Sequence, residues 1–336
     1  MLASGYSWWL FPDVSTHGSR IDSLIVWLHW FMAALFVGWG TYFVYVLVRF
    51  RARPGHEPTA KLPKAKASKW VELGVIAVEV VLLLGFEQAA GLLVSVPIWA
   101  VVRGPANAPT GEDTFEIRVV AEQFAWNIHY PGDDGEFGPT DPNLITKENP
   151  LGLDREGEDG TGADDIVTLN QMHVPLNQDI LVHLTSKDVI HSFNLPMLRV
   201  KQDTIPGMSI PVWFNATETS DNIRKSMTRT IPTDERSWLM LKNHVTMKEY
   251  ASADGTVIVK AGGTIMEETR AALADAGIAE VEAAPAFPNE IACAQLCGLS
   301  HFRMRGYMHI DTESQYLAWY AEEKAWLEES QEEEEY

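Results

Sequence analysis

Residues 293–304 read Cys293-Ala-Gln-Leu-Cys297-Gly-Leu-Ser-His301-Phe-Arg-Met304, and this stretch constrains both the fold and the chemistry. Two thiols, an imidazole and a thioether lie within twelve residues, and these ligand types suit copper. A second histidine, His191, lies about a hundred residues upstream, in Val-Ile-His-Ser-Phe-Asn-Leu-Pro. In a Greek-key sandwich, a histidine at a strand end and a later loop between two strands can meet at one end of the barrel. The pattern therefore favours a β fold.

Three interpretations of the pair Cys293 and Cys297, the only cysteines in the chain, are open. A disulfide suits an oxidising compartment, but it leaves His301 and Met304 without a role. A structural zinc site of two cysteines and two histidines has the right number of ligands, but it needs no methionine. A copper site uses all five side chains. One blue copper needs a single cysteine, whereas two thiolates can bridge two copper ions.

The sequence before this loop consists of short alternating segments separated by Gly, Pro, Asn and Asp, which predicts an all-β sandwich or Greek-key barrel. The expected strands are 114–120, 125–130, 166–169, 180–184, 212–215 and 256–260. Two insertions, about residues 131–164 and 216–286, interrupt this pattern. The first has the composition of a long loop, and residues 264–283 of the second have that of a helix. Residues 312–336 are expected to form a terminal amphipathic helix over 314–328 and a solvated acidic tail.

The N-terminal part of the chain has a different character. Residues 24–48 carry no charge, and roughly 20 apolar residues suffice to cross a bilayer. A second apolar stretch runs from about residue 73 to residue 102, and the loop between them, residues 49–70, is basic. The positive-inside rule places that loop in the cytoplasm. We therefore expect a retained transmembrane hairpin over residues 23–102, with the outer N-terminal segment 1–22 and the β domain 103–311 on the opposite side.

The charge of the chain is unevenly distributed. Of its 26 basic and 46 acidic residues, 8 and 6 precede residue 103, which leaves 18 and 40 in the remainder. Such a surface repels nucleic acid and attracts basic partners, mainly by raising their association rate at low salt. Acidity that merely keeps the domain soluble accounts for the same numbers.

The 293–304 loop resembles the binuclear copper A loop of cytochrome c oxidase subunit II. His191-Ser-Phe-x-x-Pro, followed by Lys201-x-Asp203-x-Ile205-Pro206-Gly207, is similar to the upstream histidine motif of that family. The resemblance, both helices included, spans roughly residues 20–320 apart from the insertions. It implies a cupredoxin-like domain on the periplasmic side, anchored by two helices in the plasma membrane and holding two copper ions.

The resemblance also implies a role for each residue at the matching positions. Cys293 and Cys297 would be bridging thiolates, and His191 and His301 would each cap one copper. The weak axial ligands would be Met304 on one metal and the backbone carbonyl of Gln295 on the other. These metal residues are His191, Cys293, Gln295, Cys297, His301 and Met304.

Two departures from the family pattern bear on function. Gln295 replaces a glutamate whose side chain helps hold magnesium between subunits, and an amide carries no charge, so the magnesium site is an open question. Gln123-Phe124-Ala125-Trp126 resembles the stretch of the family that passes electrons to the copper, with Phe124 in place of its first tryptophan. Either Trp126 or Phe124 serves as the point of electron input, or the donor docks differently; Trp126 is equally a candidate for the core.

On the cytoplasmic side, Glu72 aligns with a glutamate at the mouth of a proton pathway in the family. An ionisable group at the end of a membrane helix is a candidate functional residue, although Glu72 beside Lys69 is also a plausible topology anchor. The residues Trp-Thr and Pro that usually follow in the family are Val75, Ile76 and Glu79 here.

The function implied by the resemblance is electron transfer. Cytochrome c or a similar donor would reduce the two coppers, and the electron would pass to haem in subunit I, where oxygen is reduced to water and protons are pumped. Membrane lipid and other oxidase subunits are the expected partners, and nucleic acid is not. Two rivals are a quinol oxidase subunit that has lost copper and a membrane-anchored copper chaperone or storage cupredoxin.

Overall fold

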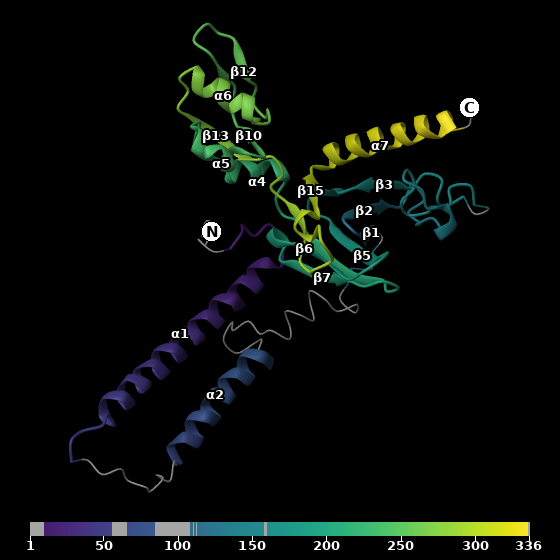
Figure 1. The fold of residues 1–336 in the computed structure, drawn as a ribbon. Helices are drawn as coiled ribbons and strands as arrows, with labels where there is room; N and C mark the ends of the chain where they lie inside the picture. The colour runs from purple at the N-terminus through teal and green to yellow at the C-terminus, as the bar shows by residue number, and fades with distance from the viewer. Residues whose placement is uncertain are drawn as a thin grey trace. The chain divides into compact units, whose positions relative to one another are not determined.

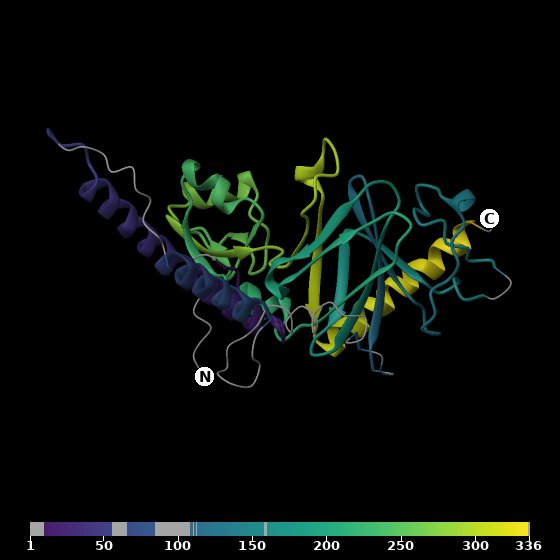
Figure 2. The same ribbon diagram turned by 90° about the horizontal axis from the view of Figure 1, so that it is seen from below.

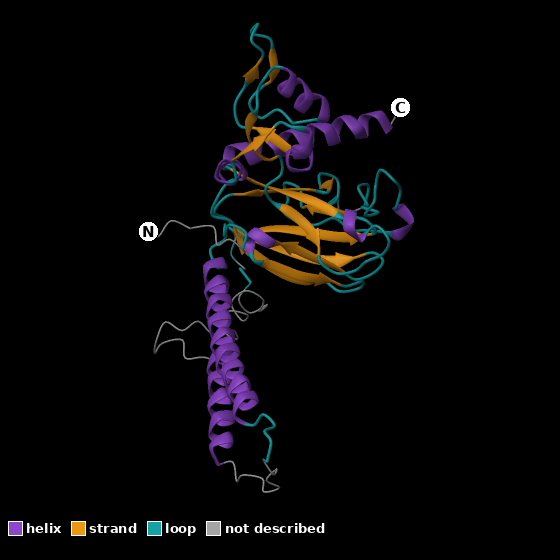
Figure 3. Ribbon diagram, turned by 60° about the vertical axis from the view of Figure 1, so that its left-hand side comes forward, coloured by secondary structure: helices purple, strands orange, loops and turns teal. Residues whose placement is uncertain are grey.

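The computed structural model describes residues 10–55, 66–84, 108–109, 111, 113–157 and 160–334 (Figure 1). The chain divides into two compact units. One consists of His17–Asn107, and the other of Met1–Thr16 with Ala108–Tyr336. Figure 3 shows that the first of these is helical, whereas the strands belong to the second.

The helical unit contains α1 (Gly18–Arg49) and α2 (Lys66–Leu84). Within the described residues, α1 is the one helix that is long and apolar enough to span a membrane. The sequence placed its start too late, because helical geometry extends upstream into the polar residues that precede the apolar run. Helix α2 starts inside the segment predicted as the basic loop, and residues 85–102 of the second predicted span lie outside the described residues. The second crossing stays a prediction.

The second unit is built on a sandwich of two five-stranded sheets, shown from a second side in Figure 2. The strand orders are β3-β2-β1-β5-β8 and β4-β15-β14-β6-β7. The first sheet consists of β1 (Phe115–Glu122), β2 (Ala125–Tyr130), β3 (Ile166–Leu169), β5 (Asp179–Ser186) and β8 (Ile210–Asn215). The second consists of β4 (Gln171–Pro175), β6 (His191–Leu195), β7 (Val200–Thr204), β14 (Glu290–Cys293) and β15 (Arg305–Asp311).

Alternation along the strands builds the core between these sheets. On β1, Ile117, Val119 and Ala121 have no exposed surface, and the fully buried Val182 and Leu184 lie on the neighbouring β5. Every second side chain of a strand points to the same face of its sheet, so these apolar residues all face the opposite sheet. The predicted all-β sandwich is confirmed, and its first five expected strands fall on β1, β2, β3, β5 and β8.

The predicted insertion 216–286 is a folded α/β element rather than a simple interruption. A core around Ile231, Leu241, Leu273 and Val281 holds it together. Its elements are α4 (Ser220–Ser226), β9 (Arg229–Pro232), α5 (Trp238–Leu241), β10 (His244–Thr246), β11 (Tyr250–Ala251), β12 (Val257–Val259), α6 (Glu267–Asp275) and β13 (Glu280–Pro285). We call this element the accessory subdomain.

Two expectations for this region are wrong. Residues 256–260 do not join the sandwich, because β12 pairs with β11 and packs on the accessory core instead. The helix predicted over 264–283 ends at Asp275. Gly277 then adopts a positive φ of 76°, which a helix cannot continue, and the following residues form β13 between β9 and β10.

The other predicted insertion, 131–164, is a loop held by a buried hydrogen bond between His129 and Asp165. His129 Nε2 lies 2.5 Å from Asp165 Oδ2, neither side chain is exposed, and the other oxygen of Asp165 accepts the amide of Gly132. Gly152 has a φ of 63°, and a Cβ there would lie 2.2 Å from the carbonyl oxygen of Asp141. This loop, which also contains the short helix η2 (Pro142–Leu144), is therefore tied to the end of β2.

Helix α7 (Glu313–Glu334) closes the chain and extends into the predicted acidic tail. Its anchor is a stack of rings on the outer face of the second sheet. His173 lies between Trp319 at 4.3 Å and His309 at 4.2 Å, with interplanar angles of 6° and 7°. The predicted amphipathic pattern of this helix is only partly correct, because Trp326, an apolar residue within 314–328, is 64% exposed.

This ring stack makes folding sensitive to acid. Burial, together with the nearby charge of His173, lowers the pKa of His309 to about 4. Between that value and about 6.5 the unfolded chain binds a proton that the folded chain does not. The free energy of unfolding should therefore fall by about 1–3 kcal/mol as the pH drops through this window. Urea unfolding of the full chain, at several pH values, measures the slope.

The variant His309→Gln is expected to remove that part of the slope. His244→Gln in the accessory subdomain is the matched control and should retain it. An unchanged slope in His309→Gln would show that another group carries the acid sensitivity.

Candidate metal centre

Three adjacent strands of the second sheet assemble the candidate centre. His191 opens β6, Cys293 ends β14, and Met304 immediately precedes β15. Strand β14 pairs with both neighbours, with Cys293 opposite Phe193 on β6. The sheet therefore brings together residues that lie about a hundred positions apart. Cys297 lies in the loop between β14 and β15, and His301 opens the short helix η5 (His301–Arg303) in that same loop.

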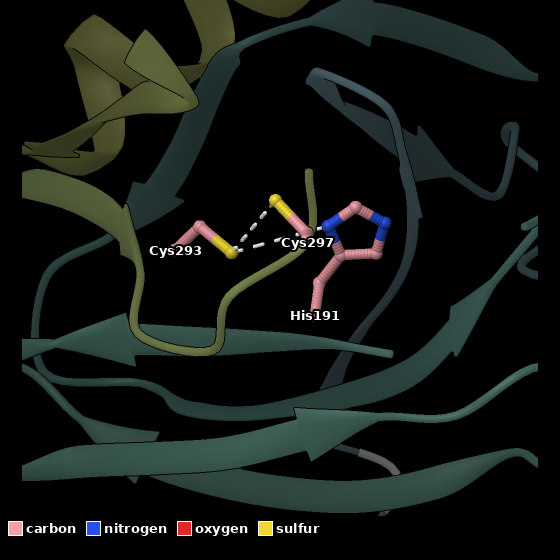
Figure 4. A group of neighbouring side chains, drawn as sticks. All are labelled: His191, Cys293 and Cys297. Carbon is pink, nitrogen blue, oxygen red and sulfur yellow. Dashed lines mark hydrogen bonds between the residues drawn. The ribbon is translucent and has the colours of Figure 1, made fainter. Parts of the chain in front are cut away.

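Figure 4 shows the sulfur atoms of the two cysteines close to each other and to the His191 ring. They are 3.7 Å apart, whereas a disulfide bond is about 2.05 Å long, so both thiols are free. Two sulfurs bound to one tetrahedral metal at about 2.3 Å each lie about 3.8 Å apart. The observed spacing therefore fits thiolates that share a metal and contradicts the disulfide interpretation.

Each sulfur contacts groups from two sides. Cys293 Sγ lies 3.9 Å from His191 Nδ1 and 3.2 Å from the carbonyl oxygen of Gln295. Cys297 Sγ lies 3.8 Å from Met304 Sδ and 3.5 Å from His301 Nδ1. His191 Nδ1 and Met304 Sδ are themselves 3.2 Å apart. The donors thus surround both sulfurs: His191 and Met304 contact each other, the Gln295 carbonyl lies beside Cys293, and His301 lies beside Cys297.

The two thiols differ in acidity. Burial acts to raise the pKa of Cys293, but hydrogen bonds with the His191 ring and with the backbone of Ser192 and Gln295 outweigh it and lower the pKa to about 6. Burial and the neighbouring Cys293 raise the pKa of Cys297 to about 12. Two thiolates this close repel each other, so only a cation between them makes ionisation of both favourable.

Asp188 holds the buried ring of His191 from behind, and sequence reasoning missed it. Its Oδ1 lies 2.9 Å from His191 Nε2, the ring nitrogen that faces away from the sulfurs. Its Oδ2 accepts the backbone amide of Gln123 at 2.7 Å. Partial burial raises the pKa of Asp188, but the hydrogen bond with His191 and those with backbone amides leave it below the usual value. The carboxylate fixes the ring so that Nδ1 faces the sulfurs.

Replacing Asp188 with asparagine is expected to weaken copper binding by roughly 10–100-fold, because the amide is a poorer partner for the outer nitrogen of His191. Competition with a chelator of known affinity measures the change. Asp254→Asn, in the turn of the accessory hairpin, is the matched control. Equal affinities for the two variants would show that the carboxylate has no role in orienting the ring.

Trp126 is buried, so it cannot contact a docked protein. It has no exposed surface, and its ring packs edge-on against His191 at 6.2 Å and Phe193 at 5.6 Å. The register of β2, with Trp126 opposite Ala121, turns this side chain into the sandwich. This position fits the alternative of a core residue, and the electron-input role of Trp126 stays a prediction.

Phe124, two residues earlier, is half-exposed and lies against the cysteine loop. A Cβ on Gly298 would meet the Phe124 ring at 3.1 Å. Gln123 donates from Nε2 to the carbonyl oxygen of Cys297 at 2.5 Å, which ties this segment to the loop. Of the two aromatic candidates, Phe124 is the one that reaches both the surface and the loop.

Three large apolar side chains project from the loop between the ligand positions. Leu296 is 75% exposed, Leu299 96% and Phe302 74%. We call these three residues the apolar collar. Sequence reasoning missed them because periodicity marks buried faces, and these positions belong to a loop without periodicity. The sequence offered one signal that these side chains are exposed: they stand among polar and ligating residues in a loop.

The remaining predicted residues are placed as follows. The side chain of Gln295 is exposed, while its carbonyl oxygen faces Cys293. Glu72 lies in the first half of α2 and is exposed. The magnesium site and the proton pathway stay predictions.

Comparison with known proteins points to one family. Residues 116–223 match the family described as cytochrome C oxidase subunit II, periplasmic domain, a range that includes His191 but not the cysteine loop. The alternative cytochrome c oxidase subunit 2 of Bradyrhizobium diazoefficiens is 25% identical over 319 residues, covering 94% of this chain and 84% of that protein. Cytochrome c oxidase subunit 2 of Cereibacter sphaeroides is 28% identical over 206 residues, covering 59% and 64%.

A solved structure is also similar. It is the crystal structure of the periplasmic domain of subunit II of cytochrome oxidase of Bradyrhizobium japonicum, with 20% sequence identity and a TM-score of 0.33. The similarity covers 66% of this chain and 99% of that one.

Proposed function

The chain belongs to the cytochrome c oxidase subunit II family, and from this premise we propose that it accepts electrons at a binuclear copper centre. Membership makes it a subunit of a haem–copper oxidase, an oxidoreductase complex, with a cupredoxin-like domain and a membrane anchor. The number of coppers, the direction of electron transfer and the individual residue roles belong to the proposal.

One observation carries the proposal: each sulfur contacts one member of the His191–Met304 pair and one further donor from the cysteine loop. Cys293 lies between His191 and the Gln295 carbonyl, and Cys297 lies between Met304 and His301. A blue-copper site would use one thiolate and leave the other without a metal. Donors on both sides of a sulfur pair fit two metals bridged by both sulfurs.

The contacts around the two sulfurs suggest which residues would bind each copper. His191 and Met304 would hold one copper, His301 and the Gln295 carbonyl the other, and the two thiolates both. Bound there, the copper pair would take up one electron and share it between two metals. The protein keeps the cage rigid, because three ligands are fixed by strands and Asp188 fixes the ring of His191. A rigid cage changes little between oxidation states.

The proposal extends to the rest of the complex. Cytochrome c or a similar donor would reduce the centre, and the electron would pass to haem in subunit I for reduction of oxygen to water coupled to proton pumping. α2 and the stretch after it would form the second membrane crossing, and Glu72 would lie at the mouth of a proton pathway. Gln295 offers an uncharged amide where magnesium would bind, so a magnesium ion there would need other ligands.

Purification of the intact membrane complex tests this function. We expect two coppers in this subunit, a mixed-valence binuclear spin-resonance signal and rapid reduction by cytochrome c. A mononuclear blue signal would favour a copper chaperone or storage protein instead. A complex without copper in this subunit that oxidises quinol would favour the quinol oxidase alternative.

The apolar collar provides a contact surface for the donor beside the metals. Three exposed side chains cover a few hundred Å², a scale that suits a transient redox encounter. The double variant Leu299→Ser/Phe302→Ser is expected to raise KM for cytochrome c roughly tenfold, because buried apolar contacts are lost, while kcat stays unchanged.

Steady-state oxidation of cytochrome c measures both constants. The matched control is Leu239→Ser/Met240→Ser on α5, where two side chains are also exposed, at 85% and 57%. An unchanged KM in the collar variant would place the donor contact elsewhere. Loss of assembly with subunit I would assign the collar to the subunit interface.

A further inference from the structure

The insertion 131–164 and helix α7 are fastened to each other at the end of the sandwich away from the copper loop. Tyr320 of α7 donates to Asp133 Oδ1 at 3.1 Å, and Lys324 forms an ion pair with Asp133 Oδ2. Figures 1 and 2 both show α7 running beside this loop. Neither segment belongs to the two sheets, so the surface between them is an addition to the sandwich.

A groove of about 540 Å³ lies between these two segments. Its floor is apolar, with Leu153, Ile166 and Leu327 buried in it. Trp326 projects from α7 at the side of the groove with 64% of its surface exposed. A large aromatic side chain left in solvent beside an apolar depression is typical of a contact surface rather than of a solvated helix face.

The rim of the groove carries a one-sided charge. Four carboxylates line it, against a single basic residue, Arg155. The Arg155 guanidinium donates to the carbonyl oxygens of Gly162 and Ala163, which are part of the loop itself. The four acidic residues are Glu148, Asp154, Glu156 and Glu323. An apolar floor with an acidic rim is complementary to a basic segment that carries an apolar anchor.

The groove lies away from the candidate metal ligands. Trp126 lies against His191, and Tyr130, four residues further along β2, packs against Trp319 of α7 at 5.1 Å. These steps extend about 13 Å along the strand and then about 10 Å along the helix to Trp326. A protein held here is therefore bound at a place distinct from the metal ligands.

We propose that the groove between residues 131–164 and α7 docks a lysine- or arginine-rich segment of a partner protein through an aliphatic or aromatic anchor beside Trp326. The acidic rim raises the association rate and selects the sign of the partner's charge, and the apolar floor holds the anchor. This inference is independent of the copper centre and extends beyond the proposed function. It assigns a role to two segments for which the proposed function gives none.

Fluorescence anisotropy of labelled synthetic peptides, titrated with the full chain in detergent, tests the proposal. The probe is a short peptide of lysine and leucine. One control peptide replaces leucine by serine, and the other replaces lysine by glutamate. We expect the lysine–leucine peptide to bind with a micromolar Kd that weakens as salt is raised, and both controls to bind much more weakly.

Because the whole domain is acidic, variants must separate the groove from the general charge. Glu148→Gln/Glu323→Gln should weaken binding of the lysine–leucine peptide roughly tenfold. Glu268→Gln/Asp275→Asn, which removes the same charge from α6, should leave it within about twofold. Trp326→Ala should reduce its binding to the level of the lysine–serine peptide. Absence of binding, equal weakening by both acidic pairs, or full affinity in Trp326→Ala would each overturn the proposal.

Discussion

Serine in place of Cys297 is expected to reduce the copper content of the subunit from two ions per chain to at most one. The Cys297 sulfur touches Cys293, His301 and Met304 at 3.5 to 3.8 Å, so its removal takes a shared ligand from both proposed metal positions. His191, Cys293, His301 and Met304 remain, and one thiolate, two imidazoles and one thioether are the donor types of a single mononuclear copper site. Replacing both cysteines should abolish copper binding.

Copper per chain, measured by elemental analysis with spin-resonance spectra of the purified complex, checks this expectation. Ala294→Ser, on the same loop, is the matched control: it adds a hydroxyl without removing a ligand and should retain both ions. Two coppers retained in the doubly substituted protein would overturn the assignment of the whole centre.

Sequence reasoning could single out candidate ligands because a metal restricts the chemical types of its ligands. Thiol, imidazole and thioether groups in one short loop form a donor set that suits copper and that neither a disulfide nor a zinc site requires. The remaining ligand, His191, stands in a motif of its own. The β sandwich could be predicted from the sequence for a related reason. The start of β1 alternates in polarity because Ile117 and Val119 face the core, and that alternation is visible before folding.

The missed features depend on contacts that no local pattern records. Asp188 matters because its oxygens face His191 and the amide of Gln123, which comes from a different strand connection. The hairpin β11–β12 alternates as a sandwich strand does, and only its packing on a second core reveals its place. Leu299 is an apolar residue of a type that is usually buried in a core, but here its side chain is exposed to solvent. Tertiary context overrides local preference at each of these positions.

Trp126 is expected to be the aromatic residue on which the stability of the centre depends most. The variant Trp126→Ala removes a fully buried ring from between His191 and Phe193, and should cost about 3–5 kcal/mol of the free energy of unfolding. The cavity also leaves one face of the His191 ring without support. Copper affinity should therefore fall together with stability, although Trp126 is not a ligand.

Urea unfolding and copper affinity are the two measurements, and Phe124→Ala is the matched aromatic variant. Because Phe124 is half-exposed, its loss should cost at most about 1.5 kcal/mol while slowing electron transfer from the donor. Trp126→Phe keeps most of the packing and separates the two roles. If that variant folds normally but raises KM for cytochrome c, Trp126 takes part in donor contact after all. An unchanged KM assigns it to the support of His191, because a residue without exposed surface reaches a partner only through its neighbours.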